Sequence, residues 1–190
     1  MTNAIILHGA PEKEHYYDPK KPSESNAHWL PWLQKELIIR DIKADTPEVP
    51  HSYEPDWNTW VKEVERFDIG AETILVGHSF GGGFWLRYLS ERPDLKVGKV
   101  VLVGPWLDPN HTLQQDIFKD TFDRQLVSRT KQLVIFQSDD DSDSVHTSIA
   151  RIKDEIDGIT FRHFTGLGHF TYENLNSTAF TTLRDEVLHD

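Results

Sequence analysis

The chain carries the segment TILVGHSFGGGFWLRY at residues 73–88. Residues 73–77 suit a buried strand and residues 82–90 a helix, with a Gly-x-Ser-x-Gly motif centred on Ser79 between them. A turn this sharp strains the serine backbone and presses the residues two positions away against neighbouring backbone, so only small side chains fit there. Gly77 and Gly81 occupy those positions. The segment therefore predicts a nucleophile elbow that exposes Ser79, and an idle serine in a glycine-rich turn is the alternative.

Two other glycine motifs fail on the same residues. A phosphate-binding P-loop needs Lys followed by Ser or Thr after its last glycine, but Gly82 is followed by Gly83 and Phe84. A dinucleotide-binding fingerprint that starts at Gly81 needs a small residue at position 86, which is Leu86. Nucleotide binding through this turn is therefore excluded.

Short apolar segments alternate with helical ones along the whole chain. The expected strands span residues 4–7, 36–42, 73–77, 99–103, 132–136 and 160–164, and the expected helices span residues 27–35, 57–67, 82–90, 113–124, 145–156 and 179–188. Alternation of this kind predicts an α/β fold with a mostly parallel six-stranded sheet and helices on both faces. A chain of 190 residues is expected to form a single domain, residues 1–190, with surface loops at 12–25 and 41–56.

Composition narrows the possible functions. The formal net charge is -11, from 20 Lys and Arg against 31 Asp and Glu, so the chain should repel nucleic acid and anionic membrane. It has no cysteine, which excludes disulfides, thiolate metal sites and a cysteine nucleophile. No apolar run approaches the roughly 20 residues that span a bilayer, and no secretory signal is visible at the start. We expect a cytoplasmic protein.

A serine hydroxyl becomes a nucleophile only when a base removes its proton and a third group orients that base. The expected strand at 132–136 runs into aspartates at 139–141, and the expected strand at 160–164 runs into a loop that contains His169. Parallel strands end at one edge of the sheet, so both groups should lie near Ser79. His169 is the predicted base, and one of the aspartates is the predicted acid.

A calcium loop is the competing interpretation of this acidic run. Asp139, Asp141 and Asp143 match its first three ligands. The loop then requires Gly at position 144 and Glu at 150, where the chain has Ser144 and Ala150. No metal site and no cofactor are therefore expected.

Several motifs together carry a family resemblance. They are IILHG at 5–9, HWLPWL at 28–33, VGHSFG at 76–81, SDDD at 138–141 and GHF at 168–170. With these motifs the chain resembles the small serine hydrolases of the α/β-hydrolase superfamily that are grouped with retinoblastoma-binding protein 9 and its bacterial relatives. The resemblance implies a compact α/β-hydrolase fold and a Ser-His-Asp triad of Ser79, His169 and Asp141, with Asp140 as the alternative acid.

An oxyanion hole should accompany the serine. One donor is the backbone N–H of Phe80, which follows the nucleophile, and we assign the second to Ala10 in the loop after the first strand. His8 either lines the substrate pocket or packs in the core. Trp106 either forms a wall of the acyl pocket or is a buried structural residue.

These residues predict a serine hydrolase that cleaves small carboxylic esters, thioesters or amides through an acyl-enzyme intermediate. The stretch between Val103 and Gln132 is too short for the large lid of true lipases, so the site should be open to small-molecule substrates. The alternative is a protein-binding module on a hydrolase scaffold with weak or vestigial activity, because fold alone does not fix function.

Overall fold

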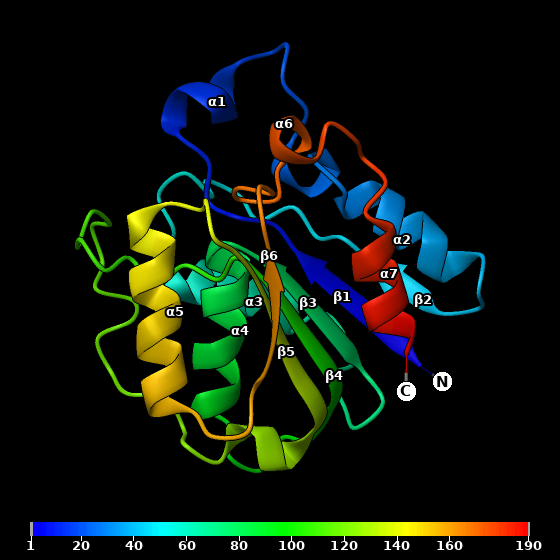
Figure 1. Cartoon of the computed structure of the whole chain (residues 1–190), viewed down its shortest axis with the longest axis vertical. Helices are drawn as coiled ribbons and strands as arrows, with labels where there is room; N and C mark the ends of the chain where they lie inside the picture. The colour runs from blue at the N-terminus through cyan, green and yellow to red at the C-terminus, as the bar shows by residue number, and fades with distance from the viewer. Residues whose placement is uncertain (1, 190) are drawn as a thin grey trace.

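The structure, a computed structural model, describes residues 2–189 as three layers, with one sheet between two sets of helices (Figure 1). The strands are β1 (Asn3–Leu7), β2 (Lys43–Asp45), β3 (Ile74–His78), β4 (Val97–Val103), β5 (Thr130–Ser138) and β6 (Thr160–Phe164). They form one sheet in the order β2-β1-β3-β4-β5-β6, and every neighbouring pair is parallel. The predicted α/β fold with a six-stranded parallel sheet is confirmed.

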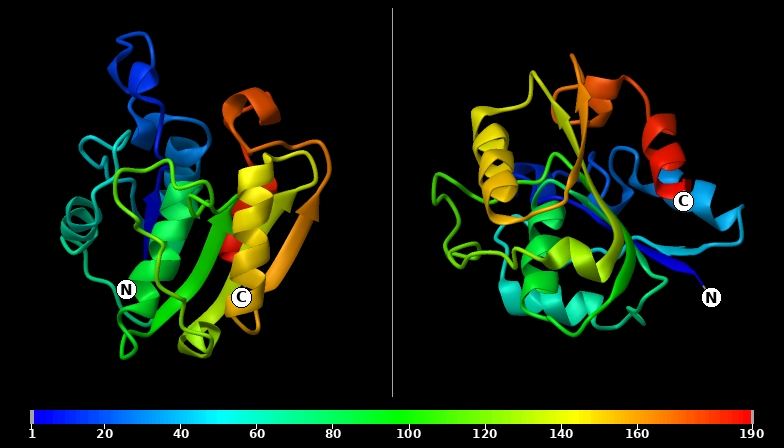
Figure 2. Two further views of the ribbon diagram at one scale, coloured as in Figure 1. Left: turned by 90° about the vertical axis from the view of Figure 1, so that its left-hand side faces the viewer. Right: turned by 60° about the horizontal axis from the view of Figure 1, so that its bottom comes forward.

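Helices cover both faces of this sheet. Figures 1 and 2 show α2 (Leu30–Ile38) and α7 (Thr181–Leu188) on one face, and α3 (Trp57–Val64), α4 (Phe80–Ser90) and α5 (Asp143–Glu155) on the other. Two short helices, α1 (Lys13–Tyr17) and α6 (Tyr172–Leu175), lie beyond the carboxyl ends of the strands. Two 3-10 turns, η1 (Glu24–Asn26) and η2 (Leu126–Arg129), complete the described elements. No helix within residues 2–189 is long and apolar enough to cross a membrane.

The alternation of side chains along each strand builds two cores. In β1, Ile5 and Leu7 belong to the core on the side of α3, α4 and α5, whereas Ala4 and Ile6 belong to the core on the side of α2 and α7. Strands covered on both faces bury every side chain, which is why they appear in the sequence as continuous apolar runs. Most predicted elements are found with ends shifted by at most three residues.

The strand predicted at residues 36–42 is wrong. Helix α2 runs through this region to Ile38, and the strand is the short β2, which begins at Lys43. Leu30, Leu33 and Leu37 are the buried residues of α2, at helical spacing. Ile38 and Ile39, whose β-branched side chains suggested a strand, lie on the outside and are 48% and 56% exposed.

The helix predicted at residues 113–124 is also wrong. This segment, between β4 and β5, has turns and no helix, although it buries Ile117, Phe118 and Phe122. Arginines of the neighbouring helices donate to its carbonyl groups: Arg87 Nη1 to Ile117 O at 2.6 Å, and Arg151 to Phe118 O at 2.7 Å and Asp120 O at 2.9 Å. Because side chains satisfy these acceptors, the segment needs no helical hydrogen bonds.

The sheet order creates a topological switch point between β1 and β3. The chain passes from β1 to β2 on one side, and the remaining strands lie on the other side of β1. The loops that leave the carboxyl ends of β1 and β3 therefore diverge, and ligands of open α/β sheets bind in the crevice at this point. The β1 loop contains Ala10 and the β3 loop contains Ser79, so the fold brings two predicted site residues together.

Replacing Arg151 tests the account of the 113–124 segment. Arg151→Leu leaves two carbonyl groups without donors and should lower the free energy of unfolding by about 1–3 kcal/mol. Backbone amides of residues 113–124 should exchange with deuterium faster, while those of β4 should not. The matched control is Arg66→Leu, because this side chain is 68% exposed in an ion pair with Glu63 and should matter little. If both substitutions lowered the free energy of unfolding equally, the arginine bonds would not be what holds this segment.

Candidate active site

Ser79 stands at a strained turn between β3 and α4, with φ 53° and ψ -119°. A non-glycine residue adopts a positive φ only where its surroundings impose it. A Cβ atom on Gly77 would lie 2.6 Å from backbone atoms of Gly81, and one on Gly81 would lie 2.5 Å from the carbonyl oxygen of His8. Both glycines are therefore required by close approach, as the sequence predicts.

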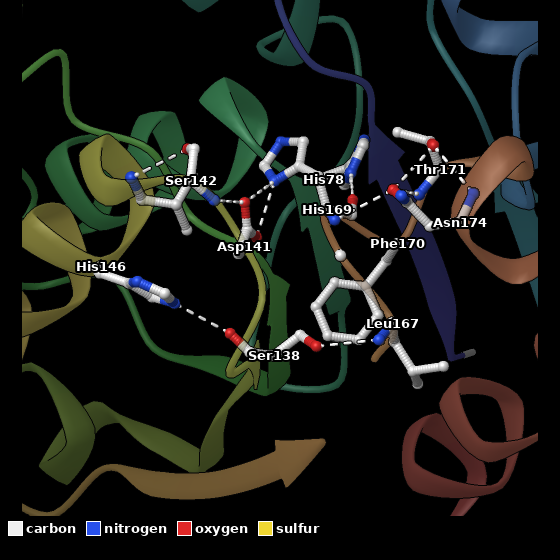
Figure 3. A network of polar contacts seen from close by, with 12 residues as sticks. His78, Ser138, Asp141, Ser142, His146, Leu167, His169, Phe170, Thr171 and Asn174 are labelled. Atoms are coloured by element: carbon white, nitrogen blue, oxygen red, sulfur yellow. Dashed lines mark hydrogen bonds and ion pairs between the residues drawn. The ribbon is translucent and has the colours of Figure 1, made fainter. Parts of the chain in front are cut away.

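His169 pairs with Asp141 at the ends of β6 and β5. The His169 Nδ1–H donates to Asp141 Oδ2 at 2.9 Å, with Oδ1 at 3.1 Å (Figure 3). The Asp141 side chain is 2% exposed, and its Oδ1 also accepts from the Ser142 N–H at 2.7 Å. A hydrogen bond to Nδ1 leaves the other ring nitrogen, Nε2, able to accept a proton. The pair thus has the arrangement of a general base and the acid that orients it.

Asp140, the alternative acid, bonds to the backbone of the histidine loop and not to the His169 ring. Its Oδ1 accepts from Ser138 Oγ at 2.6 Å and from the Gly168 N–H at 2.8 Å. The hydrogen bond from Ser138, followed by that from Gly168, lowers the pKa of Asp140 below its usual value. Asp140 therefore joins the β5 and β6 loops, and the imidazole faces Asp141.

Ser79 and His169 lie against the same short segment after β4. The Ser79 N–H donates to Val103 O at 3.0 Å and Ser79 O accepts from the Trp106 N–H at 3.1 Å. The His169 ring lies over Gly104, where an added Cβ would come within 3.1 Å of it. Both side chains line the same hollow, and within residues 2–189 no hydrogen bond joins them. Such bonds often tighten only when substrate binds.

The loop that carries His169 is held by side chains from other elements. Its N–H groups donate as follows: Gly166 to Asp139 Oδ1 at 3.1 Å, Leu167 to Ser138 Oγ at 3.0 Å, Gly168 to Asp140 Oδ1 at 2.8 Å and His169 to Asn174 Oδ1 at 3.0 Å. Its carbonyl groups accept from buried rings: His169 O from His78 Nε2 at 2.9 Å and Phe170 O from Trp29 Nε1 at 3.1 Å. Figure 3 shows several of these bonds converging on the loop.

His78, Trp29, Ser138 and Asn174 are the residues of this network for which we predicted no role from the sequence. His78 precedes Ser79, is buried, and lies between the rings of His28 and His169, with centroids 5.5 Å and 4.9 Å away. Burial, and then the nearby His169, hold its pKa well below the usual value. His78 therefore stays neutral and donates through Nε2. The sequence did point to three of them, since Trp29, His78 and Ser138 lie in motifs that carry the family resemblance.

The two predicted oxyanion donors flank Ser79. The Phe80 N–H opens α4 and the Ala10 N–H lies in the β1 loop, and neither has an acceptor within residues 2–189. A Cβ added to Gly9 would lie 3.1 Å from Ser79 Cβ, so the β1 loop is in contact with the elbow. Unpaired backbone N–H groups beside a nucleophile can stabilise negative charge on a carbonyl oxygen.

His8 does not line the pocket. It is 1% exposed, packs against Trp60, and burial lowers its pKa. The Val49 N–H donates to His8 Nε2 at 3.0 Å, so the proton is on Nδ1, which donates to Gly9 O at 2.7 Å. The carbonyl and the N–H of a trans peptide point in opposite directions, so holding Gly9 O fixes the direction of the Ala10 N–H.

Two hollows meet at Ser79. The larger has a volume of about 630 Å³, and Trp106 lies in its wall, one of the two alternatives raised by the sequence. The smaller has a volume of about 290 Å³ and is lined by polar side chains that include Glu24, which is 7% exposed. Burial, together with the nearby Glu48, raises the pKa of Glu24 to about 7. Residues 2–189 contain no cluster of three or more His, Asp or Glu able to hold a metal ion.

Comparisons with known proteins place the chain in a family and match its fold. A model of the serine hydrolase family matches residues 21–175. YdeN, a candidate hydrolase of Bacillus subtilis, is 28% identical over 167 residues, 85% of each chain. The YdeN crystal structure has a TM-score of 0.80 at 23% identity and covers 98% of this chain and 97% of its own. A YdeN-like hydrolase from Pectobacterium atrosepticum has a TM-score of 0.63 at 16% identity, covering 98% and 88%. These two structures share the fold of this chain.

The buried Glu24 gives a pH prediction. Its pKa is about 7 in the folded chain and near 4.5 when the chain is unfolded, so the folded state holds the proton more tightly. Stability from this group is therefore present below about pH 4.5 and is lost as pH rises through about 7. Glu24→Gln should remove this loss. Measured by urea unfolding, the free energy of unfolding of the variant should exceed that of the wild type at about pH 8 and lie closer to it at about pH 5. A difference between the two proteins that does not change with pH would contradict this prediction.

Proposed function

This chain belongs to the serine hydrolase family, and we propose that it cleaves small carboxylic esters, thioesters or amides with Ser79, His169 and Asp141 as its triad. One observation carries the proposal. The His169 imidazole, bonded to the buried Asp141 at 2.9 Å, lines the same hollow as a serine held at positive φ on a strand-to-helix turn. Orientation of an imidazole by a buried carboxylate, beside a serine that faces the same hollow, is the arrangement that acyl transfer requires.

The chemistry follows in two steps. Ser79 Oγ attacks the carbonyl carbon while His169 Nε2 takes its proton, and Asp141 stabilises the imidazolium that forms. The Phe80 and Ala10 N–H groups donate to the oxyanion of the tetrahedral intermediate. His169 then gives the proton to the leaving group, and an acyl-enzyme remains. Water, activated by the same imidazole, releases the acid and restores Ser79.

The hollow supports a small-molecule substrate. Its volume of about 630 Å³ falls within the range of about 300–1,000 Å³ that is usual for small-ligand pockets. The closer grouping with retinoblastoma-binding protein 9 is part of the same proposal. It is supported by the motif residues Trp29, Ser138 and Asp140, because all three hold the His169 loop.

A fluorophosphonate probe tests this function, because it reacts only with an activated serine. The wild type should be labelled and should hydrolyse short p-nitrophenyl esters, and Ser79→Ala should lose both while staying folded. Ser128→Ala is the matched control, since this exposed serine of η2 lines neither hollow. Labelling that survives Ser79→Ala would remove Ser79 from the mechanism. A folded wild type that is neither labelled nor active would favour the protein-binding alternative.

The two aspartates give a second prediction. Asp141→Asn replaces one acceptor oxygen with an NH₂ donor, which favours the His169 tautomer without a proton on Nδ1 and should lower kcat by about 10⁴-fold. Asp140→Asn keeps an acceptor oxygen for Ser138 and Gly168, so kcat should fall by less than about tenfold. Steady-state kinetics of both variants makes the comparison. The opposite ranking would assign the acid to Asp140.

A further inference from the structure

An ester has an acyl side and an alcohol side, and this chain offers two hollows. Both include Ala10, Pro11, Ser79 and His169, so the two hollows open from the point where the proposed reaction takes place. Each hollow can therefore receive one side of the substrate. Their linings differ, and the difference indicates which side enters which hollow.

The larger hollow has the larger apolar side chains. Tyr53, Trp106, Leu113 and Val145 line it beside charged and polar residues such as Glu12 and Lys13, whereas Ala10 and Pro11 are the apolar side chains that line the smaller hollow. Apolar surface of this kind favours an acyl chain, because burying hydrocarbon removes it from water. This leaves the alcohol for the smaller hollow.

The smaller hollow holds ring nitrogens that have no partner. His28 Nδ1 accepts from the Tyr172 N–H at 3.1 Å, so the proton of the neutral ring is on Nε2, which has no acceptor within residues 2–189. His78 donates through Nε2, so its Nδ1 is a free acceptor in the same part of the chain. One unpaired donor and one unpaired acceptor thus border the same small space.

Glu24 and His15 add further side-chain atoms without hydrogen bonds. Glu24 is more than nine-tenths buried, yet its carboxyl group has no hydrogen bond within residues 2–189. The nearest ring nitrogen, His15 Nε2, is 3.6 Å away and is itself buried without a partner. Buried polar groups are normally hydrogen-bonded, and His15 Nε2 and the Glu24 carboxyl group both line the smaller hollow, where a ligand or water can complete their bonds.

The charges of the lining are balanced. Lys21 carries one positive charge and Glu173 one negative charge, and burial keeps Glu24 partly protonated near neutral pH. His28 and His78 have lowered pKa values through burial and are neutral. A lining without a dominant sign favours neither an anion nor a cation. A hydroxyl group, which donates one hydrogen bond and accepts others, matches the unpaired atoms.

We propose that the smaller hollow binds the alcohol part of the substrate and that this alcohol is a small neutral polyol of the size of glycerol. The inference rests on the proposed hydrolase function and adds the substrate class. The hydroxyl groups of the polyol bond to His28 Nε2, His78 Nδ1 and Glu24, while the acyl chain occupies the larger hollow.

The experiment compares two esters with the same acyl group, 1-monobutyrin and propyl butyrate. Their alcohols have the same carbon skeleton and differ only in two hydroxyl groups. We expect kcat/KM to be roughly tenfold to hundredfold higher for 1-monobutyrin, since two hydrogen bonds are lost with propyl butyrate. Butyrylcholine, whose alcohol is a cation, should be hydrolysed no faster than propyl butyrate.

Two variants test the lining. Glu24→Met and His28→Phe should each bring the ratio of the two kcat/KM values toward one, mainly by slowing hydrolysis of 1-monobutyrin. Glu24→Met is expected to fold, because it removes a buried carboxyl group that has no partner. His163→Phe is the matched control: His163 is an exposed residue of β6 outside both hollows, and the ratio should not change.

The possible outcomes separate the two proposals. A wild type that is labelled by the fluorophosphonate probe but hydrolyses both esters equally overturns the polyol inference and leaves the hydrolase function intact. The same holds if the ratio is high but unchanged in Glu24→Met and His28→Phe, or if butyrylcholine is preferred. A folded wild type that is neither labelled nor active overturns both.

Discussion

The position of one imidazole depends on the backbone of the loop from Gly166 to Thr171. This loop has no neighbouring strand to pair with, so its N–H and carbonyl groups are satisfied by side chains of Asp139, Ser138, Asp140, Asn174, His78 and Trp29. Each bond contributes only about 1 kcal/mol, but together they leave the loop few alternative conformations. The His169 ring is thereby held between Asp141 and the hollow that Ser79 lines.

The partners of this loop come from distant parts of the chain. Trp29 belongs to the segment before α2 and His78 to the end of β3, and Asp139 and Asp140 follow directly after β5. These same residues lie in the motifs by which the sequence resembles its family. The motifs outside the elbow therefore include the support of the histidine loop, which explains how Trp29 and Asp140, which line neither hollow, can be characteristic of a group of hydrolases. His8 has a similar supporting role, since it orients the peptide that carries the Ala10 N–H.

Much of the fold and of the candidate site was predictable from the sequence because it follows from local rules. Buried strands require continuous apolar runs, and the elbow requires small residues two positions from Ser79. Asp140 and Asp141 follow the same strand one residue apart, so only the direction of each side chain could separate them. The 113–124 segment could not be foreseen, because its carbonyl groups are satisfied by Arg87 and Arg151 from distant helices. The burial of the His8 ring could not be predicted either, because contacts with Trp60 and Val49, distant in the sequence, fix it.

In the proposed mechanism, Ser79, His169 and the backbone N–H groups of Phe80 and Ala10 all act on the carbonyl group of the substrate. A crystal structure of the protein after reaction with a fluorophosphonate would show whether they converge. We expect continuous density from Ser79 Oγ to phosphorus, with a phosphoryl oxygen about 2.7–3.1 Å from both N–H groups and His169 Nε2 within hydrogen-bond reach of the adduct. An adduct on another residue, or a phosphoryl oxygen that points away from both N–H groups, would rule this mechanism out.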